Sequence, residues 1–333
     1  MKYRDLVYGE VIIKEPLVIE LIISPSFQRL KGVDQYGYRP LWVNPSVKAK
    51  DIEASRFRHS LGIYLLLKKF NAPFEEQIAG LVHDVSHTTF SHCIDYALSS
   101  GSEKEQNHQD NVFQDFILKS EIPVILRKYN LNPSFIFDDS NFPLKEKKLP
   151  DLCADRIDYS LRDGLVHEIL INEDANYFLG NLTIKDSQWV FKNYRSAEKF
   201  AKFFNKINSS HYSGFLAAVM FRAVGDYLKY SIEKGYIHES DFYTTDKEIL
   251  AKIEKNVKKD KKLQLLHDRL NKKVGAKNNP KNYEAHVFCK SRVIDPLCLN
   301  NGVLKRVSKI EPKWKKIIAE ESKPKEYFIK FER

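Results

Sequence analysis

Three histidines and one aspartate lie within ten residues of the chain, at His83, Asp84, His87 and His92. The apolar run at 79–82 that leads into them is typical of a buried helix. On a helix, His83 and Asp84 would point about 100° apart and could both reach an ion between packed helices, and His87 would share their face. Ordinary core or surface histidines are the alternative, but burying these groups without partners is costly. The cluster therefore predicts metal or phosphate chemistry.

A metal ion at this cluster needs further ligands, and two other segments offer them. Upstream, His59 lies in the first turn of a strongly apolar helical run. Downstream, a Pro-Asp pair at 150–151 predicts the start of another helix. In that helix Asp155, Tyr159 and Asp163 recur every four residues and form one polar stripe. We therefore expect ligands from at least three helices to meet at one site.

Four segments of the chain, in this order, resemble the motifs of HD-domain metal-dependent phosphohydrolases. They are most similar to the deoxynucleoside triphosphate (dNTP) triphosphohydrolases of that superfamily, the SAM- and HD-domain protein and its bacterial relatives. The four segments are Phe-Gln-Arg-Leu at residues 27–30, Arg-Phe-x-His-Ser-Leu-Gly at 56–62, a His-Asp motif at 79–92, and Asp-Arg-x-Asp-Tyr at 155–159. The last of these is followed by Arg-Asp at 162–163. The resemblance covers most of the chain and implies four metal ligands: His59, His83, Asp84 and Asp155.

This ligand set constrains the metal and the reaction. Two imidazoles and two carboxylates suit Mn, Fe, Co, Ni or Zn, and these donor types do not discriminate among the five metals. A second ion such as Mg, bridged by Asp84, is compatible with the set. A bound ion with open positions lowers the pKa of water and polarises a phosphoryl oxygen. The reaction that the resemblance implies is attack at the α-phosphorus of a dNTP, which releases a deoxynucleoside and inorganic triphosphate.

The resemblance also implies catalytic and substrate-binding residues. His92 would be the general acid, a role that suits imidazole near neutral pH. His87 would contact the substrate, His108 would lie near the phosphates, and Asp84 would take part in catalysis as well as in metal binding. The substrate-binding residues would be Gln35 and Tyr36 at the deoxyribose, Arg56 and Arg156 at the phosphates, Tyr159 and Asp163 at phosphate and sugar, and Tyr212 at the base or sugar.

The sequence departs from the family motifs at several of these positions. Residues 6–8 replace part of an Asp-Pro-x-His-Gly opening, and Tyr36 stands where the family has an apolar residue. Gln109 replaces a glutamate beside His108, which removes an orienting or proton-accepting group. Two assignments keep an alternative, because Gln35 also suits an exposed helix and Tyr212 also suits a core aromatic.

Three functions are compatible with these residues. The first is a dNTP triphosphohydrolase. The second is an HD phosphohydrolase acting on another nucleotide phosphate ester, such as a nucleoside monophosphate or a cyclic nucleotide. The third is a nucleotide- or nucleic-acid-binding module without turnover. The intact set of four ligands disfavours this function, whereas the replacement of a glutamate by Gln109 keeps it open. Alarmone hydrolysis is disfavoured because the Glu-Asp pair that follows His-Asp in those enzymes is missing.

Composition and charge set the remaining expectations. The 333 residues carry 54 Lys and Arg against 44 Asp and Glu, a formal net charge of +10, which favours polyanionic partners. Much of the lysine lies at 252–281, which we interpret as a solvated helical face, with nucleic-acid binding as a secondary alternative. No apolar run could cross a bilayer, no secretory signal is recognisable, and four cysteines without Cys-x-x-Cys spacing suit reduced thiols. We therefore expect a cytoplasmic protein with no membrane association.

The expected fold is mainly α. An HD-domain helical core would carry a short N-terminal strand pair, a small hairpin at 182–191 and a minor α/β C-terminal appendage. The core would span residues 1–240, and a lysine-rich α/β C-terminal region, 241–333, would serve assembly or regulation. The resemblance implies a homo-oligomer with a nucleotide activator at a subunit interface. Arg29 is a candidate for that activator site, with an exposed helix residue as the alternative.

Overall fold

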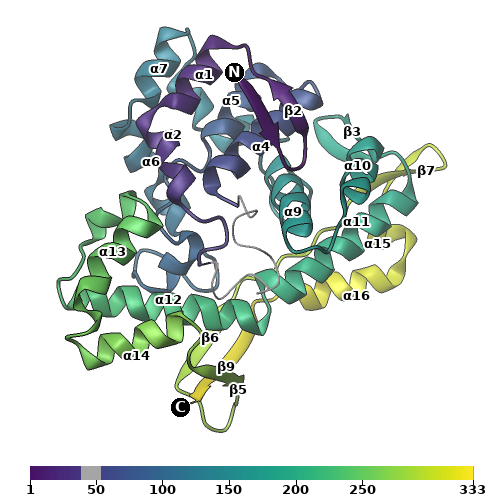
Figure 1. The fold of residues 1–333 in the computed structure, drawn as a ribbon. Helices are drawn as coiled ribbons and strands as arrows, with labels where there is room; N and C mark the ends of the chain where they lie inside the picture. The colour runs from purple at the N-terminus through teal and green to yellow at the C-terminus, as the bar shows by residue number, and fades with distance from the viewer. Residues whose placement is uncertain (39–53, 333) are drawn as a thin grey trace.

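The computed structural model describes residues 1–38 and 54–332 (Figure 1). The fold is mainly helical, as predicted, and the strands form three small sheets. The N-terminal strand pair is confirmed as an antiparallel hairpin of β1 (Lys2–Asp5) and β2 (Gly9–Ile12), in which Asp5 lies opposite Gly9.

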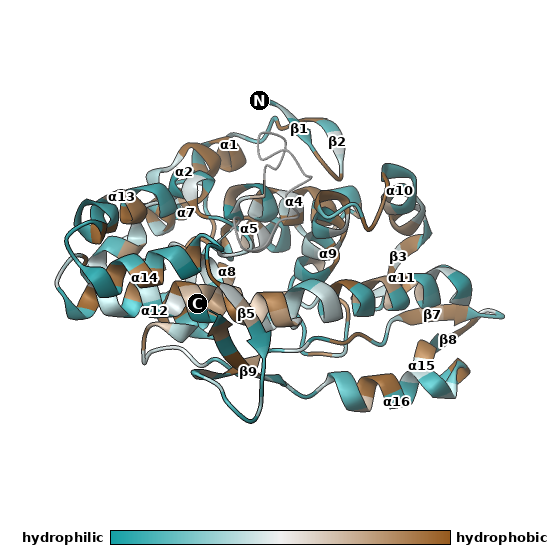
Figure 2. Cartoon of the chain, turned by 60° about the horizontal axis from the view of Figure 1, so that its bottom comes forward, coloured by the Kyte–Doolittle hydropathy of each residue, from teal (hydrophilic) through white to brown (hydrophobic). Residues whose placement is uncertain are grey.

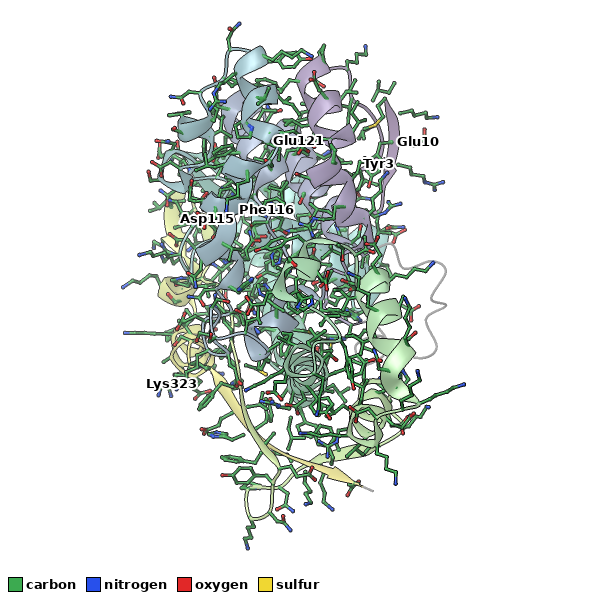
Figure 3. The ribbon with its side chains drawn as sticks, turned by 90° about the vertical axis from the view of Figure 1, so that its left-hand side faces the viewer. Tyr3, Glu10, Asp115, Phe116, Glu121 and Lys323 are labelled. Carbon is green, nitrogen blue, oxygen red and sulfur yellow. The ribbon has the colours of Figure 1, made fainter. Side chains whose placement is uncertain are left out.

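Two short helices follow the hairpin, α1 (Pro16–Ile23) and α2 (Pro25–Arg29). Each begins with a proline, which suits the first helical position because the N–H there has no acceptor inside the helix. The Glu121 carboxylate accepts hydrogen bonds from the Ser26 backbone N at 2.8 Å and from its Oγ at 2.9 Å. The Glu121 side chain, which Figure 3 labels, therefore lies at the N-terminal end of α2, where the helix dipole is positive.

Three buried helices form the centre of the protein: α4 (Arg56–Lys69), α5 (Phe74–Val82) and α9 (Ala154–Val166). Helix α4 packs against both of the others. Gly62 of α4 permits its close approach to α9, since a Cβ at this position would lie 2.2 Å from Asp158 Oδ1 and 2.3 Å from Arg162 Nη2.

The segment after α5 is not helical, which corrects the prediction that the His-Asp motif lies on a helix. Helix α5 ends at Val82, and turns separate it from a 3-10 helix, η2 (Ser91–Tyr96). Arg29 of α2 donates hydrogen bonds to two carbonyl oxygens of these turns, each at 2.8 Å, and Phe90 has a left-handed φ of 60°. The hydrogen bonds from Arg29 and the backbone conformation of Phe90 oppose continuation of α5. His83 and His87 therefore project from the segment between α5 and η2, and His92 projects from η2.

Helices cover this centre and continue to the end of the predicted core. The predicted hairpin is confirmed as β3 (Leu182–Lys185) and β4 (Gln188–Phe191). The other elements, in chain order, are η1 (Leu30–Gly32), α6 (His108–Lys119), α7 (Ile122–Lys128), α8 (Pro133–Ile136), η3 (Asp139–Asn141), α10 (Asn172–Asn181), α11 (Tyr194–Ile207), the π-helical turn η4 (Asn208–Tyr212), α12 (Phe215–Glu233) and η5 (Glu239–Tyr243).

The C-terminal region contains both helices and strands, as predicted. Its elements are α13 (Asp246–Val257), α14 (Lys261–Leu270), β5 (Gly275–Asn278), β6 (Ala285–Cys289), β7 (Leu297–Asn300), β8 (Val303–Arg306), α15 (Val307–Ile310), α16 (Pro312–Glu321) and β9 (Lys325–Glu332).

This region packs closely against the rest of the chain. Strand β7 pairs in parallel with β4, giving a sheet of order β3-β4-β7-β8, and a second sheet has the order β5-β9-β6. Helix α14 lies along α12 (Figure 1), and α13 and α14 carry many hydrophilic residues (Figure 2). The boundary at residue 240 stays a prediction. Among the described residues, no helix has the length and apolar character needed to span a bilayer.

A buried group of charged residues connects the N-terminal hairpin to α9. The Arg162 side chain is 0% exposed, and its Nη2 lies 3.0 Å from Asp158 Oδ1 and 3.2 Å from Asp5 Oδ2. The Tyr8 hydroxyl donates a hydrogen bond to Asp158 Oδ1 at 2.9 Å. We call Asp5, Tyr8, Asp158 and Arg162 the buried network.

Replacing Arg162 with methionine removes the cation of the buried network and leaves two buried carboxylates without it. Breaking a buried ion pair from one side typically costs about 3–5 kcal/mol. We expect Arg162→Met to lower the free energy of unfolding by that amount, as measured by urea denaturation. The control is Lys128→Met, which removes an exposed pair with Glu20 and should cost at most about 1 kcal/mol. Equal losses in the two variants would contradict this account.

Candidate metal centre and its cavity

Three of the four predicted metal ligands converge from separate elements. One ligand atom from each of His59 in α4, His83 in the turn after α5 and Asp155 in α9 lies within 4.8 Å of the others. Asp155 Oδ1 is 2.9 Å from His59 Nε2 and 3.8 Å from His83 Nε2. These distances leave room for one ion among the three groups.

Asp84, the fourth predicted ligand, adjoins this cluster. Its Oδ1 lies 3.2 Å from His83 Nε2, and its Oδ2 lies 3.8 Å from His59 Nε2. Arg56 Nη1 donates a hydrogen bond to Asp84 Oδ2 at 2.8 Å. Burial alone would raise the pKa of Asp84, but its interactions with His83, Arg56 and His87 hold it well below its usual range. Asp84 is therefore a carboxylate at neutral pH.

Neighbouring acceptors orient both imidazoles toward the cluster. His59 Nδ1 lies 2.8 Å from Asp158 Oδ2 of the buried network, and His83 Nδ1 lies 2.9 Å from the Gly80 carbonyl oxygen. A carbonyl oxygen only accepts, so His83 donates its Nδ1–H and its Nε2 lone pair faces the cluster. Nε2 of His83 is buried, with no hydrogen-bond partner within the described ranges. Imidazoles held in this way are typical metal ligands, and the nitrogen and oxygen donors fit a divalent ion.

The charge of this centre favours a cation. Burial alone would lower the pKa of His59, but its hydrogen bonds to Asp155 and Asp158 raise it to about 9. A proton therefore occupies His59 at neutral pH in the metal-free protein. A divalent ion bound to its Nε2 would displace that proton.

A cavity of about 1030 Å³ opens beside the ligand cluster. It is large enough for a nucleotide. The predicted site residues that line it are Gln35, Tyr36, Arg56, His83, Asp84, His87, His92, Asp155, Arg156, Tyr159, Asp163 and Tyr212. His59 is buried behind this wall.

His108 is the predicted catalytic residue that the structure does not bring to the cavity wall. Its Nδ1 lies 2.9 Å from Ser100 Oγ, and the neighbouring Gln109 lines the cavity in its place. The Gln109 side chain accepts a hydrogen bond from Ser86 Oγ and donates one to the His83 carbonyl oxygen, each at 2.9 Å. Gln109 therefore supports the turn that carries a metal ligand, and a catalytic role for His108 stays a prediction.

His87 and His92 lie side by side on the cavity wall, with ring centroids 5.2 Å apart. His87 Nε2 is 3.3 Å from Asp84 Oδ1, and His92 Nδ1 is 3.4 Å from Asp95 Oδ2. Burial lowers the pKa of both imidazoles. Asp95 was not predicted from the sequence, although its position three residues after His92 was a signal for it.

A second group at the cavity consists of tyrosines around Asp163. The Tyr212 hydroxyl donates a hydrogen bond to Asp163 Oδ2 at 2.6 Å. Burial raises the pKa of Asp163 to about 7, and the neighbouring hydroxyl groups of Tyr212 and Tyr36 oppose this rise. Tyr159 contacts Tyr212 edge to face, with ring centroids 5.4 Å apart. Tyr212 therefore lines the cavity and also packs against Tyr159 as a core aromatic residue.

Cationic side chains complete the cavity wall. Arg156 Nη2 lies 3.1 Å from Glu146 Oε1, and its Nη1 donates to Cys153 Sγ at 2.9 Å. Glu146, Cys153 and Asp155 form a second cluster with metal-ligand spacing, but the Arg156 guanidinium already supplies a positive charge there. The wall also includes cationic side chains that were not predicted to belong to the site. These are Lys145, Lys147, Lys148, Lys290 and Arg292.

Metal binding to the metal-free protein should release a proton from His59. Because the pKa of His59 is raised to about 9, affinity for Mn²⁺ should increase with pH up to about 9 and then level off. Titration calorimetry at pH 7.5 in buffers of different ionisation enthalpy measures the released protons. An affinity that does not change between pH 6.5 and 8.5 would refute this linkage.

Asp158→Asn should weaken metal binding although Asp158 is not a predicted ligand. The substitution removes the carboxylate that orients His59, and such losses typically reduce affinity by about 10–100-fold. Asp115→Asn, on the exposed face of α6 (Figure 3), is the matched control and should leave the Kd for Mn²⁺ unchanged. An unchanged Kd in Asp158→Asn would show that the orientation of His59 does not depend on this carboxylate.

Comparison with known proteins places this centre in a family, although no family model matches the chain. The uncharacterized protein YdhJ of Bacillus subtilis is 34% identical over 297 residues, which cover 89% of this chain and 88% of YdhJ. The metal-dependent phosphohydrolase cns2 of Cordyceps militaris is 37% identical over 180 residues, 54% of this chain and 49% of cns2. The mouse deoxynucleoside triphosphate triphosphohydrolase SAMHD1 is 30% identical over 151 residues, 39% of this chain and 22% of SAMHD1.

Two solved structures share the fold over essentially the whole chain. A hypothetical protein from Aquifex aeolicus has a TM-score of 0.71 and 20% identity, and the match covers 99% of this chain and 95% of that one. A phosphohydrolase from Bacteroides thetaiotaomicron has a TM-score of 0.69 and 17% identity, with both chains covered completely. These two likenesses show the fold alone. With the convergent His and Asp side chains, the sequence similarity to YdhJ over most of the chain and to the metal-dependent phosphohydrolase cns2 over half of it shows that the chain belongs to the HD-domain metal-dependent phosphohydrolase superfamily.

Proposed function

We propose that the protein is a dNTP triphosphohydrolase, which hydrolyses a dNTP to a deoxynucleoside and inorganic triphosphate. The observation that carries this proposal is a single cavity of about 1030 Å³ whose wall combines metal ligands, cationic side chains and tyrosines. These are the groups needed for the phosphates, the reacting α-phosphorus and the nucleoside. The partial similarity to mouse SAMHD1 supports the same substrate class.

The four ligands would hold one divalent ion, and their donor atoms suit Mn, Fe, Co, Ni or Zn. A second ion such as Mg is a further proposal. Such an ion makes water more acidic and polarises a phosphoryl oxygen. The other tasks belong to the side chains of the protein.

His92 is the proposed general acid. Burial and the nearby charges of Arg56 and Arg292 lower its pKa, while its hydrogen bond and charge interaction with Asp95 oppose this effect. A polyphosphate in the cavity would offset the positive charges and raise the pKa of His92. Substrate binding would thereby protonate the imidazole that then donates to the departing 5′-oxygen of the nucleoside.

Arg56 and Gln35 have free polar groups for the two ends of the substrate. Arg56 is fixed by hydrogen bonds from Nη1 to Asp84 and from Nε to Ser91, which leaves other N–H groups for a phosphate. Gln35 Oε1 is buried at the cavity with no hydrogen-bond partner in the described part of the chain. We propose that it accepts a hydrogen bond from a deoxyribose hydroxyl, with the Tyr36 ring beside it.

A second candidate is hydrolysis of another nucleotide phosphate ester, such as a nucleoside monophosphate or a cyclic nucleotide. The neutral Gln109, whose side chain hydrogen-bonds Ser86 and the His83 carbonyl, is a departure from the motif of dNTP triphosphohydrolases and keeps alternatives to the first function open, including a binding module without turnover. Self-association and activation by a second nucleotide are further proposals.

The products distinguish these functions. Protein loaded separately with Mn, Mg, Fe or Co is incubated in ¹⁸O-water with each dNTP and with an equimolar mixture, and ion-pair chromatography with mass spectrometry resolves the products. We expect deoxynucleoside and intact triphosphate, with the ¹⁸O in the triphosphate because water attacks the α-phosphorus. Activity in the mixture alone would reveal an activator site.

Asp84→Ala is the inactive control, and Asp115→Asn on the exposed face of α6 should retain full activity. Turnover of monophosphates or cyclic nucleotides with no dNTP turnover would replace the first function by the second. Binding of nucleotides or single strands without turnover of any of them would support a binding module.

A further inference from the structure

A short segment of the C-terminal region forms part of the cavity wall. Lys290 and Arg292, which follow β6, both line the cavity. The backbone N of Arg292 donates to Asn208 Oδ1 at 2.9 Å, and Asn208 Nδ2 donates to Ser291 Oγ at 3.0 Å. Asn208 begins the π-helical turn η4 that carries Tyr212. Residues 290–292 are therefore held by hydrogen bonds to η4, an element that already contributes Tyr212 to the site.

The Arg292 guanidinium is held in place by neutral acceptors. Its Nη2 donates to Gln106 Oε1 at 2.9 Å, and its Nη1 donates to the Lys290 carbonyl oxygen at 3.3 Å. Gln106 is 3% exposed and has a left-handed φ of 50°, a strained conformation of the kind that occurs at ligand-binding sites. A guanidinium has five N–H donors, so several of those on Arg292 stay available.

Arg292 differs in its ion pairing from the other two arginines of the wall. Arg56 is paired with Asp84 at 2.8 Å, and Arg156 with Glu146 at 3.1 Å. Within residues 1–38 and 54–332, no carboxylate oxygen pairs with Arg292 or with Lys290, whose Nζ donates to the Glu105 carbonyl oxygen at 2.7 Å. The charges of Asp110 and Glu105, which line the same cavity, act on Lys290. Arg292 is thus the cation of this segment whose charge is the less compensated by neighbouring carboxylates.

The charge of Arg292 acts on two residues of the site. Burial lowers the pKa of His92, and Arg292 lowers it further. Burial raises the pKa of Tyr159, and Arg292 opposes that rise. Arg292 lines the same cavity as the proposed general acid and as Tyr159 of α9, and an anionic substrate in that cavity would compensate its charge.

We propose that Arg292, assisted by Lys290, binds the phosphate chain of the substrate, so that the C-terminal region completes the active site. The identity of the substrate rests on the proposed function, but the chemistry recognised is that of a polyphosphate, free or in a nucleotide. A guanidinium suits this task because its planar fork matches two phosphate oxygens.

The test measures binding without turnover. Titration calorimetry measures the Kd of inorganic triphosphate, deoxyadenosine and orthophosphate for the full, Mn-loaded chain. The proteins compared are the wild type, Arg292→Gln and Arg292→Lys. The control is Arg195→Gln, which removes the same charge from an exposed position at the start of α11. Melting temperature and Mn content establish that each variant is folded and loaded.

We expect Arg292→Gln to raise the Kd of triphosphate by about tenfold or more and to leave that of deoxyadenosine unchanged. Arg292→Lys should give an intermediate Kd, because it keeps the charge but loses the fork, and Arg195→Gln should match the wild type. If Arg292→Gln does not fold, an intermediate Kd in Arg292→Lys supports the proposal and a wild-type Kd overturns it.

Three other results would also overturn it. These are wild-type affinity for triphosphate in Arg292→Gln, equal losses for triphosphate and deoxyadenosine, or no binding of triphosphate by the wild type. The proposed function fails separately. A wild type that leaves dNTPs intact, with triphosphate binding still weakened by Arg292→Gln, would refute only the triphosphohydrolase. Turnover of dNTPs with an unchanged KM in Arg292→Gln would refute only the role of Arg292.

Discussion

The contact between α4 and α9 is the constraint on which the metal centre depends. His59 of α4 lies between Asp155 and Asp158 of α9, and Asp158 is in turn paired with Arg162. Gly62 permits this approach because any larger residue would collide with Asp158 and Arg162. One buried network therefore both stabilises the fold and orients a predicted metal ligand, so we expect changes in packing to change metal affinity as well.

The residues of the candidate metal centre could be identified from the sequence, but their local structure could not. His59, His83, Asp84 and Asp155 are identified by residue type and by short motifs, which do not require knowledge of the fold. The helix predicted through His83 was wrong because Arg29, more than fifty positions upstream, hydrogen-bonds the carbonyl groups of the turn. A helical periodicity in the sequence contains no information on such a distant donor.

The unpredicted part of the site consists of residues that reach it through long-range contacts. Arg292 has no motif around it, and its place on the cavity wall follows from the hydrogen bonds of its segment to Asn208 and Gln106. The helices and the hairpin at 182–191 were predicted because their signals, apolar periodicity and turn residues, are local. The cavity depends on how those elements pack, which the periodicity does not specify.

The parallel pairing of β4 with β7 has a consequence for the order in which the protein forms during synthesis. Val190 pairs with Leu297, more than a hundred positions later, and closing so long a loop makes such contacts slow to form. Until residues 297–298 have left the ribosome, one edge of β4 lacks its partner and is open to pairing with other chains. All residues of α4, α5 and α9 are synthesised well before then, whereas the sheet that contains β4 cannot be completed until β7 and β8 have been synthesised.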